Sequence, residues 1–551
     1  MTRSNYLAET HEVSNTPPPL HNYNLYQQDT ALKEAVAREG AHWAHHQLLC
    51  YGEQTGSEEM IEWGHLANRH KPEFNTHDRY GHRIDQVDFH PSYHQLMERA
   101  IGEGIPSQPW TTPKPGAHVA RAALNYLQSQ VEAGHGCPLT MTFAAVPTLL
   151  KHPGVASRWL PLMHSGRYDP RNLPIAQKRG ATIGMAMTEK QGGSDVRANS
   201  TRAYPIADDE IGQRFQLVGH KYFVSAPMSD AFLMLAYTDR GLSCFLVPRW
   251  LEDGHKNPMQ ILRLKEKCGN ASNASSEAEL RGAEGWLIGE EGRGVANILE
   301  MVALTRFDCM VGSAAGMRQA SVQALHHCHH RAAFGKVLDQ QPLMQNVLAD
   351  LAIESEAAMM MAMRMARALD SNDERDALLV RLGTAIGKYW ICKRTPGHAY
   401  EAMECIGGSG VMETTIMPRL YREAPVNAIW EGSGNVQALD MLRTLHREPE
   451  ALEVVRDEIM LGRGLHDQFD RFITPLDTLF ANPAEFEYRA RHIAGQLALA
   501  IQASVLLRSG SDTVADAFCQ SRLGQGNGWL YGDLPVGIDC AAIIDRARPK
   551  L

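Results

Sequence analysis

The sequence predicts an α+β protein of several domains, with helical regions on either side of an antiparallel β-domain. The chain has 551 residues, too many for one compact core, and the usual domain size suggests about three or four domains. Apolar residues recur at helical spacing near both ends, whereas short runs rich in Val, Phe, Leu and Tyr occupy the middle. We therefore expect four regions, at 1–180 (helical), 181–290 (β), 291–445 (helical bundle) and 446–551 (helical extension).

The first region mixes polar loops with helical stretches. The clearest helix runs from Val119 to Glu132, where alanines and leucines recur at i, i+3, i+4 and i+7. Pro-Gly pairs at 115–116 and 153–154 mark turns between its parts. We expect this region to be mostly helical.

The second region carries runs of strand-like composition, at 215–218, 222–225, 232–237 and 244–247. Between the last two lies Asp239-Arg-Gly241, where a glycine can supply the positive φ of a tight hairpin. The pattern indicates an antiparallel sheet.

Helical periodicity returns in the third region. Val295, Ile298, Leu299 and Val302 form one apolar stripe of an amphipathic helix. Long helices follow, and the fourth region is again helical by pattern, with a Gly-rich break at 523–532.

Composition limits the classes of function and the cellular compartments that fit the chain. A net charge of -9 and a pI near 6.3 argue against a protein coated in basic residues, so any nucleic-acid contact has to rest on a local patch. The ten cysteines form no Cys-x-x-Cys pair, which favours the reduced thiols of a cytoplasmic protein over disulfides or structural zinc. Residues 1–20 do not have the pattern of a secretory signal, and we expect no membrane span.

The most informative window reads G-M-A-M-T-E-K-Q-G-G-S-D-V, from Gly184 to Val196. Its small residues let the backbone approach a ligand closely, and the hydroxyls of Thr188 and Ser194 can donate to ring carbonyls or phosphate. Taken alone, the window is equally compatible with an ordinary turn, because Gly-Gly-Ser-Asp is common turn chemistry.

The segments that follow make this pattern specific. Gly219-His-Lys-Tyr-Phe-Val-Ser225 comes next, and the two segments together resemble the flavin-binding signature of the acyl-CoA dehydrogenases. Further segments are similar to later motifs of that family in the same order: Arg331-Ala-Ala-Phe-Gly-Lys336, Ile406-Gly-Gly-Ser-Gly410, and Tyr421-Arg-Glu423 through Trp430-Glu-Gly-Ser433. The resemblance covers about half of the chain, residues 181–440.

The resemblance implies a helical N-terminal domain, a central antiparallel β-barrel, a C-terminal helical bundle and non-covalently bound FAD. It places Thr188 at the pyrimidine edge of the flavin and Ser194 at the pyrophosphate. It also implies that Phe223 lies against the flavin ring and that Ser225 bonds near N5, the atom that accepts the hydride.

The same resemblance implies cofactor contacts across subunits. Arg331 and Gln341 would reach the pyrophosphate and the adenosine end from a neighbouring subunit, and a guanidinium suits a pyrophosphate because two parallel donors meet two oxygens. The other predicted cofactor contacts are Met187, Gly193, Val224, Glu404, Gly407, Gly408, Trp430, Ser433 and Asn435.

Glu431 is the predicted catalytic base. The family's reaction removes an acidic α-proton beside a thioester carbonyl while a hydride leaves the β-carbon, so it requires a carboxylate that faces the flavin. An apolar pocket closed by Trp430 would raise the pKa of that carboxylate and make it a better base. A surface glutamate before a Gly-Ser turn is the alternative interpretation.

Three positions depart from the family pattern. Trp430 replaces the usual Tyr and predicts a narrow acyl pocket. Glu404 stands where a Gln is common near the cofactor. Thr305 occupies the position of an alternative base in some members, which leaves Glu431 as the candidate.

Two clusters have competing interpretations. The histidines at 326, 327, 329 and 330 suggest a metal, but only pairs spaced by three or four share a helix face and no carboxylate or cysteine completes an obvious site, so we expect none. The methionines of 359–365 suggest a ligand-binding box, but their alanine-rich helical context favours packing.

Three features resemble the AidB-like branch of the family, the alkylation-response flavoproteins. They are T-P-P-P-L-H-N-Y-N-L-Y at 16–26, I-W-E-G-S-G-N at 429–435, and about 100 residues beyond the usual end of the family. This resemblance implies homotetramers, weak acyl-CoA dehydrogenase activity, and binding of double-stranded DNA through the carboxy-terminal extension.

The DNA prediction has mixed support in the sequence. From Arg447 to Leu551 there are 11 Lys and Arg against 15 Asp and Glu, a balance of -4, so the extension is not basic as a whole. Arg443 and Arg447 lie four apart on a predicted helix and are the candidate DNA contacts, with a solvated helix face as the alternative. Two other functions stay open: a catabolic acyl-CoA dehydrogenase whose extension serves only oligomerisation, and a DNA-binding protein with a structural flavin.

Overall fold

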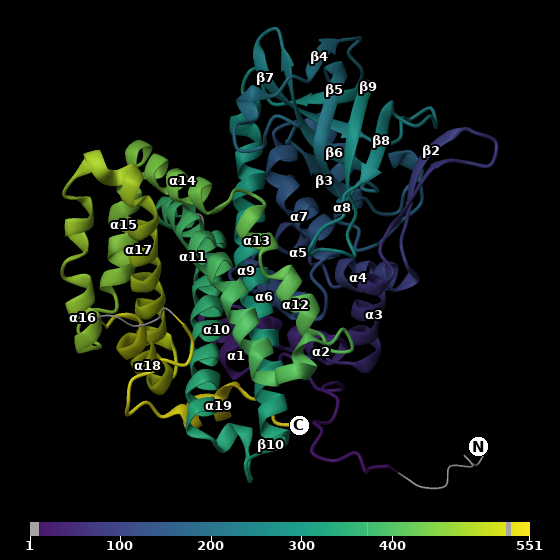
Figure 1. Ribbon diagram of the computed structural model, residues 1–551. Helices are drawn as coiled ribbons and strands as arrows, with labels where there is room; N and C mark the ends of the chain where they lie inside the picture. The colour runs from purple at the N-terminus through teal and green to yellow at the C-terminus, as the bar shows by residue number, and fades with distance from the viewer. Residues whose placement is uncertain (1–9, 372, 525–529) are drawn as a thin grey trace.

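The computed structural model describes residues 10–371, 373–524 and 530–551. A β-barrel stands at one end of the molecule, long helices run away from it, and the extension lies along one side of these helices (Figure 1). Residues 1–9 at the amino terminus lie outside the described residues, and so do residues 525–529 of the predicted Gly-rich break. Within the described ranges, every helix is too short or too polar to cross a membrane.

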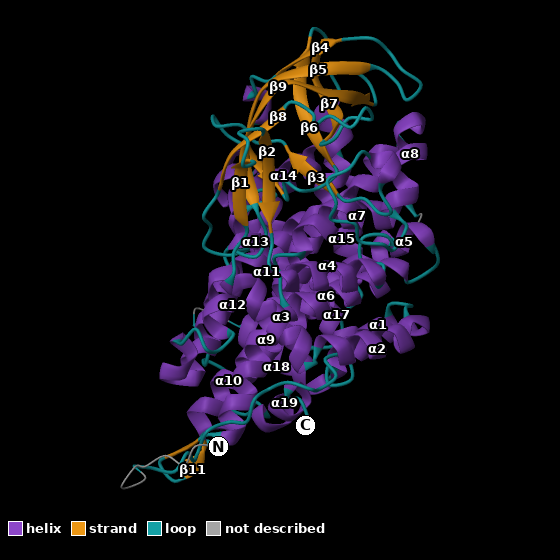
Figure 2. Cartoon of the chain, turned by 90° about the vertical axis from the view of Figure 1, so that its right-hand side faces the viewer, coloured by secondary structure: helices purple, strands orange, loops and turns teal. Residues whose placement is uncertain are grey.

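The first region is mostly helical, as expected. Its helices are α1 (Thr30–Arg38), α2 (His45–Thr55), α3 (Glu58–Arg69), α4 (Pro91–Gly102), α5 (Gln108–Thr111), α6 (Ala117–Val131), α7 (Gly136–Leu150) and α8 (Pro153–Met163). The sequence did not indicate the antiparallel hairpin of β1 (Glu73–His77) and β2 (Arg83–Asp88), which projects beside the barrel (Figure 2). Strand β1 is polar and almost wholly exposed, so it lacks the alternation that marks a half-buried strand.

Seven strands form the barrel. They are β3 (Ile183–Ala186), β4 (Arg202–Pro205), β5 (Arg214–Ser225), β6 (Ala231–Thr238), β7 (Gly241–Pro248), β8 (Met259–Leu264) and β9 (Ser275–Ile288). Neighbours run in the order β3-β5-β4-β6-β7-β9-β8, and the pairing of β5 with β9 closes the sheet on itself. Most pairings are antiparallel, as expected, but β3 and β4 each pair in parallel with β6, which strand composition alone does not reveal.

One long strand replaces two of the predicted runs. The runs at 215–218 and 222–225 are both parts of β5, whose register against β9 shifts twice along its length. The predicted hairpin joins β6 to β7, and Gly241 there has a φ of 126°, a left-handed backbone that glycine adopts at little cost. Apolar side chains such as Phe232 and Phe245 fill the barrel interior.

Among the described residues, three long helices and three shorter ones form the bundle. They are α9 (Gly294–His330), α10 (Pro342–Leu369), α11 (Glu374–Ile406), α12 (Met417–Glu423), α13 (Val426–Ile429) and α14 (Gly434–Arg447). Ile298 and Val302 of the predicted stripe are buried, whereas Leu299 is exposed. The methionines of 359–365 are all buried in the helical core, in agreement with the packing interpretation.

The extension consists of helices as expected, and buried ion pairs dock it to the bundle. Its helices are α15 (Glu450–Met460), α16 (Asp467–Ile473), α17 (Phe486–Ser509), α18 (Asp512–Arg522) and α19 (Cys540–Ala547). Arg522 pairs with Asp350 and Glu354 of α10, and Glu458 accepts two hydrogen bonds from Arg364. Charges buried in pairs fix the extension in one orientation, because any other docking would leave them unpaired.

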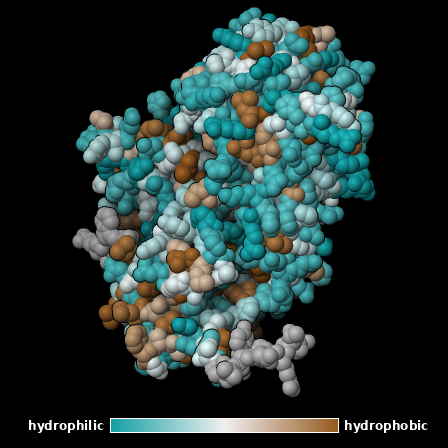
Figure 3. All heavy atoms as spheres, turned by 45° about the vertical axis from the view of Figure 1, so that its right-hand side comes forward, coloured by the Kyte–Doolittle hydropathy of each residue, from teal (hydrophilic) through white to brown (hydrophobic). Residues whose placement is uncertain are grey.

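A small hairpin forms the end of the molecule opposite the barrel (Figures 1 and 2). It consists of β10 (Ala332–Ala333) and β11 (Lys336–Val337), which follow α9. Phe334 at its turn and Leu343 at the start of α10 are almost fully exposed. The face drawn in Figure 3 is largely hydrophilic, and apolar side chains gather toward its lower end.

Candidate functional site

A cavity of about 70 Å³ lies where the barrel meets the bundle. Ser225, the last residue of β5, lines it from the barrel, while Trp430 and Glu431, between α13 and α14, line it from the bundle. The structure therefore brings the predicted base and the predicted N5 contact to one cavity, although they are far apart in the sequence.

Buried donors fix the loop that carries Glu431. The ammonium of Lys388 on α11 donates to the carbonyl oxygens of Trp430 and Gly432, at 2.6 Å each. The amide of Gln437 donates to the carbonyls of Glu431 and Gly432 at 3.0 Å. Glu431 itself has a φ of 57°, a left-handed conformation that is uncommon for a residue with a side chain, and these bonds hold it there.

The Glu431 carboxylate has one partner among the described residues. The hydroxyl of Thr305 donates to its Oε2 at 2.8 Å. Thr305, at the position that was weighed as an alternative base, therefore contacts the predicted base.

The cavity around Glu431 has walls of mixed character. Trp430 does contribute an apolar face, but its indole N–H donates to Asn427 at 2.8 Å. Asp308 and Glu423 also line the cavity, with Asn, Ser and Thr side chains. The walls thus combine apolar and polar side chains, and the expectation of an apolar pocket closed by Trp430 stays a prediction.

Glu423 is a second carboxyl group in this cavity, and sequence reasoning named it only as part of a motif. It accepts hydrogen bonds from the backbone N–H of Asn270 at 2.5 Å and from the amide of Asn270 at 3.4 Å. Burial raises the pKa of Glu423 to about 7, against the lowering effect of these bonds. The cavity thus contains a group that titrates near neutral pH.

A buried ion pair organises the barrel loop, residues 187–201. Glu189 accepts hydrogen bonds from the backbone and hydroxyl groups of Ser200 and Thr201, and from the ammonium of Lys221 at 2.9 Å. Burial alone would raise the pKa of Glu189, but Lys221 and the loop donors lower it to about 2. Neither partner was predicted as a site residue, although both lie inside the quoted motifs.

The free donors of the barrel loop fit a flavin. Across the described part of the chain, the hydroxyls of Thr188, Ser194 and Ser225 have no hydrogen-bond partner, so they are available to a ligand. A side chain at Gly193 would come within 2.5 Å of the Thr188 hydroxyl, so only glycine keeps this turn close. These donors and this close approach suit the carbonyls and phosphates of FAD.

The other cofactor contacts predicted in the barrel differ in how exposed their side chains are. Phe223 is 40% exposed, and the ammonium of Lys265 lies 4.5 Å from its ring centre. Met187 is partly buried against the cluster beside the barrel. The side chain of Val224 is fully buried in the barrel core, because side chains alternate between the two faces of a strand. Only its backbone is placed to contact a cofactor.

Five predicted contacts lie away from the cavity, at the opposite end of the bundle (Figure 1). Arg331 and Gln341 flank the β10–β11 hairpin, and Glu404, Gly407 and Gly408 lie where α11 ends. Cys328 near the end of α9 donates to the Cys405 carbonyl, so the two groups are neighbours. One chain does not bring them to Glu431.

The first turn of α14 carries the last two predicted cofactor contacts. Ser433 is the residue before this helix and its side chain makes no capping hydrogen bond, while Asn435 is exposed in the first turn. The side chain of Asn435 accepts a hydrogen bond from Arg491 of α17 at 2.7 Å, so the extension reaches this turn. Sequence reasoning missed Arg491 because it lies in the extension, beyond the family motifs.

The last turns of α14 carry both candidate DNA contacts. Arg443 and Arg447 are exposed. The buried carboxylate of Asp440 accepts hydrogen bonds from Arg306, Arg381 and Arg443, at 2.7 to 3.2 Å. Three guanidinium groups thus share one carboxylate, and Arg443 is the most exposed of the three.

The histidine cluster has partners other than a metal. His326 donates to the Pro18 carbonyl at 2.8 Å, His329 lies 2.7 Å from Asp339, and His330 donates to the His326 carbonyl. In the residues that the structure covers, no group of three His, Cys, Asp or Glu side chains is arranged for a metal ion.

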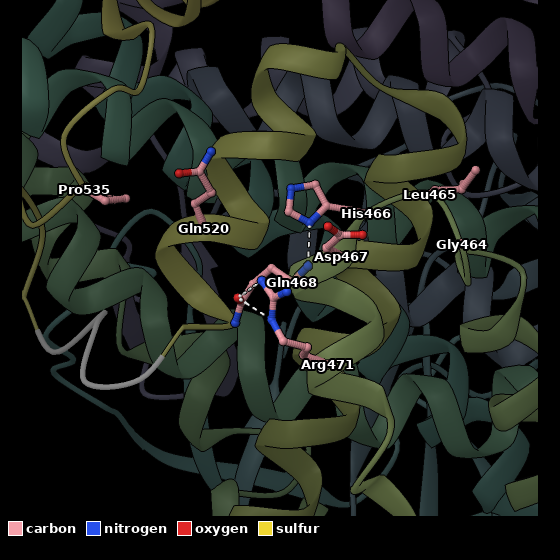
Figure 4. A pocket seen from close by; sticks show the side chains of 8 residues that line it. All are labelled: Gly464, Leu465, His466, Asp467, Gln468, Arg471, Gln520 and Pro535. Atoms are coloured by element: carbon pink, nitrogen blue, oxygen red, sulfur yellow. Dashed lines mark hydrogen bonds between the residues drawn. The ribbon is translucent and has the colours of Figure 1, made fainter.

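A separate pocket of about 630 Å³ lies in the extension (Figure 4). His466, Gln468 and Arg471 line it from α16 and its start, and Gln520 lines it from α18. The Arg471 guanidinium donates to Gln468 rather than into the pocket. None of the predicted site residues belongs to it.

Comparison with protein families matches most of the chain to three domains. Residues 15–170 match the N-terminal domain of the adaptive response protein AidB. Residues 184–283 match the acyl-CoA dehydrogenase middle domain, and residues 292–446 match the acyl-CoA dehydrogenase C-terminal domain.

Individual proteins agree with these matches. A protein of Escherichia coli (strain K12), named AidB and assigned to the acyl-CoA dehydrogenases, is 47% identical over 94% of this chain and 95% of its own length. The structure of Caenorhabditis elegans ACDH-11 in complex with C11-CoA has a TM-score of 0.84 at 28% identity and covers 93% of each chain. A Bacillus anthracis acyl-CoA dehydrogenase complexed with FAD shares the fold, with a TM-score of 0.63 at 18% identity over 78% of this chain and 80% of that one.

Proposed function

The chain belongs to the acyl-CoA dehydrogenase family, in its AidB-like branch, and from this premise we propose that it oxidises an acyl-CoA thioester with Glu431 as the base. The observation that carries the proposal is the placement of Glu431 and Ser225 in one cavity, one from the bundle and one from the barrel. FAD, the cofactor of the family, supplies the hydride acceptor when it is bound.

Glu431 is prepared to take a proton. Thr305 donates to Oε2, which orients the carboxylate and leaves Oε1 for the α-proton of the thioester. Lys388 and Gln437 fix the backbone of the loop, so the carboxylate keeps its position before substrate arrives.

We infer a short acyl group and a slow physiological reaction. A cavity of about 70 Å³ beside Trp430 leaves little room for an acyl chain, whereas the similar ACDH-11 was solved with C11-CoA.

The cofactor contacts are proposed to come from two subunits. Thr188, Ser194 and Ser225 offer free hydroxyls from one chain. Arg331 and Gln341 flank the β10–β11 hairpin, at the end of the molecule opposite the barrel, which supports their contribution to a neighbour's cofactor in a homotetramer.

Substitution of Glu431 tests the proposal. Glu431→Gln keeps the shape and the Thr305 hydrogen bond but removes the base, so reduction of the flavin by acyl-CoA is expected to fall by roughly a thousandfold or more while FAD stays bound. The control is Glu413→Gln, an exposed glutamate paired with Arg422, which should leave the rate unchanged. Anaerobic stopped-flow absorbance measures both, and an unimpaired Glu431→Gln variant would assign the base to another group.

We also propose that the chain binds duplex DNA without sequence preference, as part of a cytoplasmic response to alkylation damage. The three guanidinium groups around Asp440 favour this function, with Arg443 and Arg447 exposed on the same helix. Six buried cysteine thiols support the cytoplasmic assignment, because such thiols belong to a reducing compartment.

Two measurements distinguish the DNA proposal from the two remaining alternatives: the salt dependence of DNA binding and the reduction of the flavin by acyl-CoA. Changing both Arg443 and Arg447 to Gln should weaken binding to all sequences alike and flatten the salt dependence by about two charges per subunit, while FAD content stays constant. A parent protein that fails to bind DNA at low salt is a catabolic dehydrogenase instead. One that binds DNA but is never reduced by acyl-CoA holds a structural flavin.

A further inference from the structure

The N-terminal strap, residues 15–19, makes a specific contact that the proposed reaction does not use. The side-chain amide of Asn15 donates to the Ala332 carbonyl at 2.9 Å, and its oxygen accepts from the Ala332 N–H at 2.7 Å. One side chain thus satisfies both backbone groups of the first residue of β10, as a neighbouring strand would.

The strap also holds Arg331 directly. Arg331 Nη1 donates to the backbone carbonyl of Asn15 at 2.8 Å, and His326 donates to the carbonyl of Pro18 at 2.8 Å. Asn15 has a φ of 54°, a left-handed turn that asparagine tolerates and that presents its carbonyl and its side chain to the same hairpin. The strap is therefore attached to the last turn of α9, to Arg331 and to β10.

We propose that the N-terminal strap is a positioning element for the cofactor: Asn15 holds Arg331 in the orientation in which it meets the pyrophosphate of a neighbouring subunit's FAD. This inference rests on the proposed role of Arg331. Asn15 acts through Arg331 and is not itself assigned a contact with the cofactor.

Orientation matters at this position because Arg331 is exposed at the end of a helix. A free arginine side chain loses several rotatable bonds when it binds a ligand, and a residue that is already tethered loses fewer. The tether uses one guanidinium nitrogen and leaves other donors for the ligand. Proline at 17, 18 and 19 stiffens the strap, since each ring fixes φ.

The opposite flank of the hairpin is held as well. Gln341 donates to the Ala333 carbonyl at 2.9 Å, so Asn15 and Gln341 grip adjacent residues of β10. The strap also walls a groove of about 520 Å³, whose other wall includes Ile406 and Ser409 on either side of the predicted contacts Gly407 and Gly408. The strap is thus next to the other residues proposed to meet a neighbour's cofactor.

A matched pair of substitutions tests the proposal. Asn15→Gly keeps the left-handed backbone and removes the side-chain clasp. The control is Asn22→Gly: Asn22 also has a left-handed φ, 57°, and lies near the same terminus, but its side chain accepts from the Glu58 N–H of α3. Apoprotein titrated with FAD, followed by quenching of flavin fluorescence, should give a dissociation constant about fivefold higher for Asn15→Gly and unchanged for Asn22→Gly.

A double-mutant cycle distinguishes positioning from a general loss of structure. Arg331→Gln should weaken FAD binding by at least as much as Asn15→Gly, and Asn15→Gly should add nothing further in the Arg331→Gln background. Equal losses in both backgrounds, or wild-type affinity for Asn15→Gly alone, would overturn the role of the strap and leave that of Arg331 standing. Wild-type affinity for Arg331→Gln would overturn both assignments.

Discussion

Two loops of the candidate site are fixed in opposite ways. The barrel loop, residues 187–201, closes around a buried acceptor, because Glu189 collects hydrogen bonds from the loop's own N–H and hydroxyl groups. The base loop, residues 430–433, is surrounded by buried donors, because Lys388 and Gln437 point at its carbonyl oxygens. Each loop depends on a charged side chain that is almost fully buried.

The difference corresponds to what each loop offers to a ligand. The barrel loop keeps hydroxyl donors at Thr188 and Ser194, which suit the oxygens of a flavin nucleotide. The base loop has its carbonyls occupied, so the Glu431 carboxylate is the acceptor that it presents to the cavity. A buried negative charge thus organises the loop that presents hydrogen-bond donors, and a buried positive charge organises the loop that presents an acceptor.

The largest effect is expected at the centre of the barrel loop. Glu189→Gln leaves Lys221 buried without its counter-charge and should destabilise the protein by about 3 kcal/mol. Urea unfolding followed by tryptophan fluorescence measures the loss. Glu279→Gln on β9, whose carboxylate is one third exposed, is the control and should change stability by less than about 0.5 kcal/mol. If both variants unfold alike, the barrel loop does not depend on a buried charge.

The base loop should respond next. Lys388→Met leaves the carbonyls of Trp430 and Gly432 without donors and should cost about 2 kcal/mol, with a larger proportional loss of turnover as Glu431 moves. Lys393→Met on the same helix, where the side chain is exposed, is the stability control. Unfolding midpoints and rates of flavin reduction measure the two effects, and a variant of normal rate would separate the clamp from the chemistry.

Glu423 beside the base loop and Glu189 in the barrel loop should also differ in the sign of their pH dependence. The folded pKa of Glu423, about 7, lies above the ordinary 4.5, so the folded state binds the extra proton and loses stability as pH rises from 4.5 to 7. Glu189, with a pKa of about 2, contributes stability above pH 4.5 that is lost as pH falls toward 2. Glu423→Gln should therefore gain about 2 kcal/mol over the wild type between pH 5 and pH 8. Parallel unfolding curves at the two pH values would show that Glu423 titrates normally.

The smallest effect concerns Trp430. Trp430→Phe removes the indole donor to Asn427 while keeping an aromatic wall, so stability should fall by about 1 kcal/mol or less. The smaller ring should enlarge the cavity and raise the rate on longer acyl-CoAs relative to short ones. A rate profile across chain lengths measures this, and an unchanged profile would mean that other residues of the cavity, rather than Trp430, limit the acyl group.

The fold could be predicted because its signals are local. The hairpin at Asp239-Arg-Gly241 and the helix at 119–132 each depend on residues that are close in sequence. The parallel pairings of β3 and β4 with β6 could not be predicted, because they join strands that are separated by another strand in the sequence. The β1–β2 hairpin has no buried face and therefore no hydrophobic alternation to detect.

The candidate site was predicted unevenly for the same reason. Motifs identify Glu431 and Ser225, and the structure gives both residues the same cavity. The residues that hold the site loops belong to no motif. Lys388, Gln437 and Arg491 are polar residues of helices, and only the fold brings them to these loops. Val224 shows the opposite error, since a motif names every position while a strand turns alternate side chains into the core.

The left-handed backbone of Glu431 has a consequence for how this protein responds to selection. A side chain in that conformation costs about 1 kcal/mol relative to glycine, and asparagine also tolerates it better. Glu431→Gly should therefore give a more heat-resistant protein that has lost its base. In a mutant library screened for thermal tolerance alone, this codon is expected to drift toward glycine and asparagine, and only a simultaneous demand for turnover would keep the glutamate.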